Sequence, residues 1–85
     1  MKKLWCDRAW DEYTEWQERD KKTIRRIHML IKSIERNGYN CIGKPEPLSN
    51  NLSGLWSVRI DDKNRIIFSI ENGMLIIHSC MGHYE

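Results

Sequence analysis

The chain has 85 residues, of which 40% are hydrophobic and 31% are charged, and its formal net charge is +2. This composition is typical of one small globular domain, residues 1–85, and excludes an intrinsically disordered chain. The apolar stretches are only as long as strands, which excludes a transmembrane helix, and no signal peptide is indicated. We therefore expect a cytoplasmic protein with no membrane association, whose three scattered cysteines are reduced thiols.

The first elements in chain order are a short strand at residues 2–6 and a helix at residues 7–19, with Asp7 as its N-cap. Aromatic residues recur every three positions on one face of this helix, and we expect that face to lie in the core. These residues are Trp10, Tyr13 and Trp16.

A second helix begins at Asp20 or Thr23 and ends at Asn37-Gly38, because glycine readily adopts the left-handed conformation that follows a helix. Its apolar stripe predicts a helical hairpin packed on a sheet, and its other face is strongly basic. Such a basic face is typical either of a solvated helix or of a surface that binds nucleic-acid phosphates. The residues that would contact RNA are Lys21, Lys22, Arg25 and Arg26.

Residues 39–53 lose all periodicity and are predicted to form a long loop. Three strands follow, at residues 54–60, 65–70 and 74–80, and Asn72-Gly73 is a strong hairpin signal. The predicted fold is therefore α+β with the order β-α-α-β-β-β. An N-terminal helical hairpin covers one face of a mainly antiparallel, four-stranded sheet.

In two of these strands every even position from 56 to 60 and from 66 to 70 is apolar: Trp56, Val58, Ile60, Ile66, Phe68 and Ile70. They share one face only if even positions pair with even positions, which requires an odd-length loop or a bulge between the strands. The same parity places Arg59 and Arg65 together on the opposite face, away from the helices. Two such guanidinium groups can bind a phosphate, or they can simply form weak ion pairs with nearby carboxylates.

Glu46 and the C-terminal His83 are the remaining candidates for chemistry. Pro45 and Pro47 flank Glu46 and stiffen its backbone, which suits a positioned general base, although a solvated carboxylate in a linker turn is the alternative. His83 can act as a proton donor if the last strand holds it at the rim of the sheet; otherwise it belongs to an ordinary polar tail.

The spacing of His78, Cys80 and His83 suggests a metal site as an alternative, with the first two residues expected on one strand face. No fourth ligand and no CxxC motif accompany them, so we expect no metal.

Several motifs follow one another along nearly the whole chain: Trp5, Trp10-Asp11-Glu12-Tyr13, Trp16-Gln17, Gly43-Lys44-Pro45-Glu46-Pro47-Leu48, Asn51-Leu52-Ser53-Gly54, Trp56-Ser57, Arg59-Ile60, Arg65 and His83-Tyr84. This ordered series resembles the YoeB/Txe-type toxins of the RelE/ParE superfamily, the ribosome-dependent mRNA interferases of bacterial toxin–antitoxin pairs. The chain departs from the family pattern at Val58, where members often carry a second arginine, and at Met81-Gly82 and Glu85.

The resemblance implies that Glu46 is the general base, Arg65 the phosphate-stabilising residue and His83 the general acid. The accessory positions that contact phosphate or base are Arg59, Tyr84 and Lys44. The implied reaction is cleavage of mRNA in the ribosomal A site by attack of a 2′-hydroxyl, which leaves a 2′,3′-cyclic phosphate, and it needs no cofactor.

The implied partners are the 70S ribosome with its mRNA, a YefM/Axe-like antitoxin and, for the free toxin, a second copy of the chain. The alternative function is that of a non-catalytic ParE-like toxin that inhibits a protein target such as DNA gyrase. A plain RNA-binding module, or a toxin that has lost its activity, is a weaker alternative.

Overall fold

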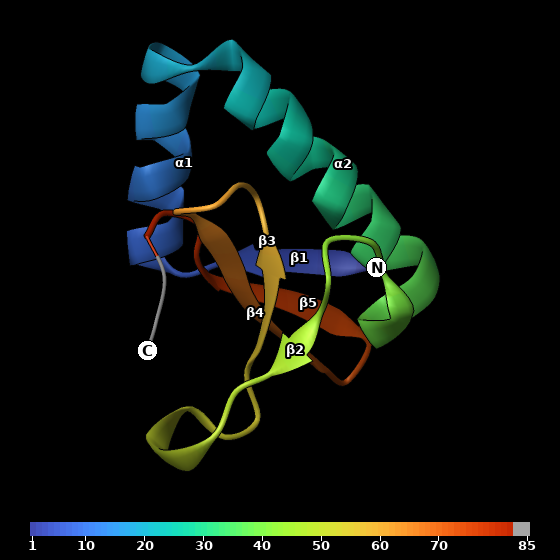
Figure 1. The fold of residues 1–85 in the computed structure, drawn as a ribbon. Coiled ribbons are helices and arrows are strands. Elements are labelled where there is room, and N and C mark those ends of the chain that lie inside the picture. Colours follow the sequence, from blue (N-terminus) through green and yellow to red (C-terminus); the bar gives the residue numbers. More distant parts are fainter. Residues whose placement is uncertain (83–85) are drawn as a thin grey trace.

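The computed structural model describes residues 1–82, so the expectations for His83 and Tyr84 lie outside the described residues. Helices α1 (Asp7–Arg19) and α2 (Lys21–Asn37) form a hairpin on one side of a sheet (Figure 1). The predicted α+β class and the helical hairpin are thereby confirmed. The strands are β1 (Lys2–Trp5), β2 (Glu46–Pro47), β3 (Trp56–Arg59), β4 (Arg65–Glu71) and β5 (Met74–Ser79).

The sheet has five strands instead of the predicted four, in the order β1-β5-β4-β3-β2. The additional strand is β2, in which Glu46 pairs with Ser57 of β3 in antiparallel orientation. Proline has no N–H to donate to the hydrogen bonds of a sheet, so Pro47 argued against a strand at this point in the sequence. Proline is nevertheless compatible with an edge strand, which is the position of β2. At the other edge β1 pairs with β5 in parallel, so the sheet is mixed.

The second helix begins at the first of its two predicted caps. The Asp20 carboxylate accepts hydrogen bonds from the backbone N–H groups of Lys22 (3.0 Å) and Thr23 (3.3 Å). The Thr23 hydroxyl also donates a hydrogen bond to the Asp20 carboxylate. These hydrogen bonds lower the pKa of Asp20 below its ordinary value, and the bond from the Thr23 hydroxyl has the largest effect. The first helix differs from the prediction by one residue, since Cys6 is its N-cap and Asp7 lies in its first turn.

The core lies between the helical hairpin and the sheet, and the predicted parity of β3 and β4 is confirmed. Trp56 pairs with Phe68 and Val58 with Ile66. The apolar stripe of α2 covers this face; the fully buried side chains include Ile27, Leu30, Ile34, Val58, Ile66, Phe68, Leu75 and Ile77.

The aromatic face of α1 is only partly in the core. Trp16 is buried, but Trp10 is 50% exposed and stands at the outer end of the stripe, so its assignment to the core was wrong. The reason is geometric: Trp10 packs edge-on against Trp5 at the end of β1, beyond the area that the sheet covers.

A register shift between β4 and β5 corrects a second expectation. Phe68 pairs with Ile77, but Ile67 pairs with Ser79, so β5 contains one extra residue at this point. His78 therefore contacts Ser69 on the open face of the sheet, whereas Cys80 is fully buried in the core. The two side chains do not share a face, because a bulge breaks the alternation on which that expectation depended.

None of the helices within residues 1–82 is both long and apolar enough to cross a membrane.

Candidate active site

The hairpin of β3 and β4 places two arginines on the open face of the sheet. Arg59 and Arg65 are directly opposed partners, and five residues connect them, which is the odd-length loop that the parity required. Asp61 fixes this loop by accepting hydrogen bonds of 2.8 Å from the backbone N–H groups of Lys63 and Asn64. Partial burial alone would raise the pKa of Asp61, but the hydrogen bonds to Lys63 and Asn64 outweigh it and lower the pKa.

Arg59 is held from two directions. Its guanidinium lies 2.8 Å from the carboxylate of Asp62, whose side chain is 96% exposed. Its backbone carbonyl accepts a hydrogen bond of 3.1 Å from the guanidinium of Arg26 on α2. An ion pair with so exposed a partner is weak, so an incoming phosphate can compete for Arg59.

The connection that carries Glu46 lies along the outer edge of β3. The Gly43 carbonyl accepts the Arg59 N–H (2.8 Å), and Leu48 N–H donates to the carbonyl of Leu55 (2.8 Å), so the segment is anchored on both sides of Glu46. Gly43 is essential to this approach: its φ is +93°, and a Cβ atom there would meet Leu30 at 2.7 Å. The sequence predicted a stiff segment, and the structure fixes it to the strand that carries Arg59.

Glu46, Arg59 and Arg65 therefore share the open face. Glu46 pairs with Ser57, which precedes Arg59 by two positions on the same strand, and Arg65 follows one strand further on. With strands about 4.8 Å apart and a rise of about 3.4 Å per residue, the Glu46 Cα lies roughly 8 Å from that of Arg59 and 12 Å from that of Arg65. Side chains of this length can contact one phosphodiester from such positions.

The segment that ends at Gly82 lies beside Arg65. Arg65 N–H donates to the carbonyl of Gly82 (2.9 Å), and Gly82 N–H donates to the side-chain oxygen of Asn64 (2.8 Å). Gly82 has a φ of +76°, which a side chain would strain. The last described residue thus lies directly beside Arg65, and the candidate acid His83 is the next residue in the chain.

Three residues that hold this segment in place were not predicted from the sequence to belong to the site. Glu12 accepts a hydrogen bond of 2.7 Å from Cys80 N–H, and the Trp16 indole donates to the Cys80 carbonyl at 2.8 Å. Asn64, described above, holds Gly82. Glu12 and Trp16 belong to the motifs quoted for the resemblance, which was the available signal, whereas Asn64 lies between two predicted strands and carried no such signal.

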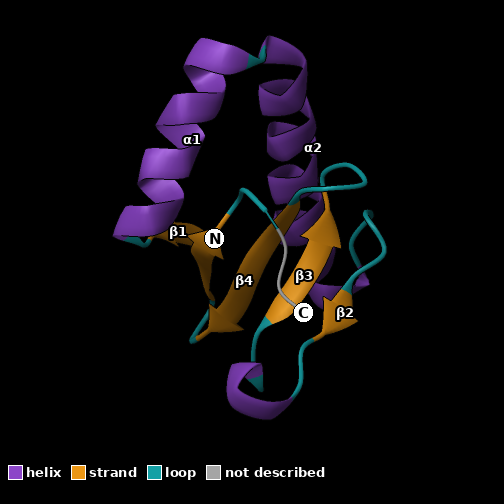
Figure 2. Ribbon diagram, turned by 60° about the vertical axis from the view of Figure 1, so that its left-hand side comes forward, coloured by secondary structure: helices purple, strands orange, loops and turns teal. Residues whose placement is uncertain are grey.

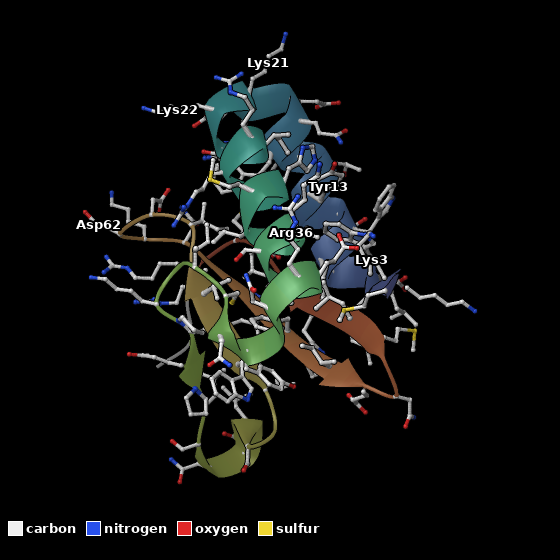
Figure 3. The ribbon with its side chains drawn as sticks, turned by 90° about the vertical axis from the view of Figure 1, so that its right-hand side faces the viewer. Lys3, Tyr13, Lys21, Lys22, Arg36 and Asp62 are labelled. Carbon is white, nitrogen blue, oxygen red and sulfur yellow. The ribbon has the colours of Figure 1, made fainter. Side chains whose placement is uncertain are left out.

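A basic surface adjoins the arginines. Lys44 and Arg26 line a shallow depression of about 310 Å³ together with Arg59, and Lys22 and Arg26 line a neighbouring one. Lys21 and Lys22 project from the tip of the helical hairpin (Figure 3). Arg25 is exposed as well, and Arg26 lines both depressions, so Arg26 connects the basic end of α2 to Arg59.

A hollow larger than these two lies elsewhere, between β1 and the helices. It has a volume of about 510 Å³, and Trp5, Trp10, Tyr13 and His28 are among the residues that line it. It contains none of the predicted catalytic residues. Within residues 1–82, no group of three or more His, Cys, Asp or Glu side chains is placed to hold a metal ion.

The comparisons with known proteins agree on one family. The sequence pattern of the family described as "YoeB-like toxin of bacterial type II toxin-antitoxin system" matches residues 5–84. The chain belongs to this family. It is 43% identical over 84 residues to Toxin YoeB of Escherichia coli strain K12, an alignment that covers 99% of the chain and 100% of that relative.

Solved structures of YoeB proteins share the fold. The chain resembles a subunit of the YoeB–YefM complex from Staphylococcus aureus with a TM-score of 0.92 at 36% identity. It resembles the YoeB dimer from the same organism with a TM-score of 0.92 at 38% identity. Each comparison covers 99% of this chain and 98% of the other. Membership in the YoeB-like family therefore extends over the whole domain.

Proposed function

We propose that this toxin is a ribosome-dependent endoribonuclease that cleaves mRNA in the A site and so stops translation. The observation that carries the proposal is the position of Glu46, Arg59 and Arg65 on one open sheet face, with Gly82 hydrogen-bonded to the backbone of Arg65. Figure 2 shows β3 and β4 in front of α2, so that this face is turned away from the helical hairpin. A carboxylate and paired guanidinium groups are suited to moving a proton beside a phosphate and to stabilising its charge.

In the proposed reaction Glu46 removes the proton from a ribose 2′-hydroxyl, and the oxygen attacks the adjacent phosphorus. Arg65 and Arg59 stabilise the charge on the non-bridging oxygens. His83, from its position next to Gly82, donates a proton to the departing 5′-oxygen. The products are a 2′,3′-cyclic phosphate and a 5′-hydroxyl, and each proton transfer contributes about 10²–10⁴-fold to the rate.

The basic end of α2 supports the ribosome as the place of action. Lys21 and Lys22 lie in the first turn of this helix, where the helix dipole disfavours positive charge, and Asp20 is the only acidic group that caps it. A surface that gathers cations at this position is suited to phosphates of ribosomal RNA. Tyr84 then contacts the base of the displaced nucleotide, and Lys44 contacts its phosphate. A toxin that acts on translating ribosomes works in the cytoplasm.

The related structures suggest the regulating partners. In Staphylococcus aureus, YoeB is found in complex with YefM and also as a dimer. We propose the same two assemblies here: a complex with a YefM/Axe-like antitoxin, and a homodimer when the toxin is free.

Primer extension on mRNA translated in vitro with the purified toxin tests the activity. We expect cuts within codons in the A site, and no cuts with the Glu46→Gln variant or on messages that carry 2′-deoxyribose at the cut position. Intact mRNA together with inhibited gyrase supercoiling would instead support the ParE-like function.

A further inference from the structure

A second cluster of reactive groups lies on the open face, away from the candidate nuclease site. The Ser69 hydroxyl lies 2.9 Å from the Glu71 carboxylate and 3.1 Å from Nε2 of His78. On its other side, Nδ1 of His78 lies 3.9 Å from Sγ of Cys6. Ser69 is four positions beyond Arg65 on β4, about 13 Å along the strand, so the cluster is separate from the arginines.

The contacts assign the tautomer of His78. The hydroxyl of Ser69 donates to Glu71, because a carboxylate only accepts, and its oxygen is then an acceptor for His78. Nε2 must therefore carry a proton, which leaves the lone pair of Nδ1 facing the Cys6 sulfur. His78 is thus positioned to take the proton of the Cys6 thiol. Ser69 is only 2% exposed, so water competes little for this relay.

Cys6 differs in this respect from the other two cysteines. Cys80 is fully buried, and burial together with the charge of Glu12 raises its pKa to about 12. Cys41 is also buried, which raises its pKa. Cys6 is only partly buried, and its backbone N–H donates to the carbonyl of Ile77 (3.0 Å), which fixes it beside His78. A thiol reacts as its thiolate, so a neighbouring base and access to solvent favour Cys6.

We propose that Cys6, with His78 as its base, is a modification site for low-molecular-weight disulfides. The thiol proton passes from Sγ to Nδ1 of His78, and the sulfur attacks one sulfur of the disulfide. A bond forms between Cys6 and that sulfur while the original S–S bond breaks, and its electron pair leaves with the second sulfur. The departing thiolate takes the proton from His78. The product is a mixed disulfide at the junction of β1 and α1, and the disulfide itself is the oxidant.

The test is the reaction of the native full-length chain with glutathione disulfide near neutral pH, followed by intact mass and peptide mapping. We expect one adduct for each chain, located at Cys6, and none on the Cys6→Ser variant. In His78→Gln the reaction should slow by about tenfold or more, since a positioned base typically contributes at least this much. Ser69→Ala keeps His78 but removes the hydroxyl that fixes its tautomer. In this variant we expect a smaller decrease in rate, of about threefold.

A denatured control separates the role of His78 from a general change in the thiol. In guanidinium chloride all three cysteines should react, and wild type, His78→Gln and Ser69→Ala should react at equal rates. Circular dichroism establishes whether each variant is folded. If His78→Gln does not fold, the reaction rate of Ser69→Ala tests the role of His78 instead. An adduct on Cys41 or Cys80, or a wild-type rate in the folded variants, overturns the proposal.

Discussion

Arg59 on β3 lies directly opposite Arg65 on β4, on the face of the sheet that the helices do not cover. Like charges in this relationship repel each other and cost stability. The fold partly offsets the repulsion with the ion pair between Arg59 and Asp62, and within residues 1–82 no ion pair involves Arg65. An arrangement that costs stability yet gathers positive charge is typical of a site selected for its ligand, which we propose is a phosphate.

The Arg65→Gln variant should therefore lose activity without losing stability. Removing one of two opposed charges should leave the free energy of unfolding unchanged or raise it by up to about 1 kcal/mol. Cleavage of ribosome-bound mRNA should fall by about 10²–10³-fold, as when one transition-state donor is lost. Urea unfolding and single-turnover cleavage measure the two quantities, and Arg36→Gln on the exposed side of α2 is the control. A variant that is both less stable and fully active would refute this account of Arg65.

Gly43→Ala should impair cleavage without removing any polar group. The new methyl group would meet Leu30 at 2.7 Å and Val58 at 3.1 Å. The backbone of the alanine would also have to keep a φ of +93°. We expect a loss of stability of about 2–4 kcal/mol from strain and overpacking together, and displacement of the segment that carries Glu46. Gly54→Ala is a matched control, because its φ is +96° but nothing lies within 4 Å of the new Cβ. Equal losses in the two variants would show that the close approach is unimportant.

How far the sequence could predict this site differs from residue to residue. The opposition of Arg59 and Arg65 followed from parity alone, because an apolar face fixes strand register. β2 could not be predicted, because two residues within a proline-rich segment carry no periodicity, and only pairing with β3 makes them a strand. The bulge that turns His78 toward Ser69 is a tertiary adjustment between β4 and β5, which no local pattern in β5 reveals.

The basic tip of the helical hairpin should control binding to ribosomes. In the double variant Lys21→Glu/Arg25→Glu, affinity should fall and the dependence of affinity on salt should become less steep, because fewer counterions are released. Lys32→Glu/Arg36→Glu makes the same change of charge near the other end of α2 and should bind nearly as wild type. Co-sedimentation with ribosomes at several salt concentrations measures both. Equal losses in the two double variants would indicate that only net charge matters.

The buried thiol of Cys80 should make the protein sensitive to alkali. Its pKa is raised to about 12 by burial and by Glu12, so between about pH 9 and 12 the thiol ionises in the unfolded chain but not in the folded one. The unfolded state then binds fewer protons, and stability falls with rising pH by at most about 1.4 kcal/mol per unit. Cys80→Ser, which has no group that titrates in this range, should show a shallower decline in urea unfolding between about pH 8 and pH 10. Parallel declines would contradict the assignment.

The most direct test of the proposed chemistry is the single-turnover cleavage rate of ribosome-bound mRNA by Glu46→Gln. This variant keeps the size and polarity of the side chain but cannot accept the 2′-hydroxyl proton, whereas Glu18→Gln on α1 makes the same change away from the site. We predict that Glu46→Gln cleaves about 10²–10⁴-fold more slowly while binding ribosomes normally, and that Glu18→Gln cleaves at the wild-type rate. Cleavage by Glu46→Gln at the wild-type rate would contradict the account, because the open face would then lack its base.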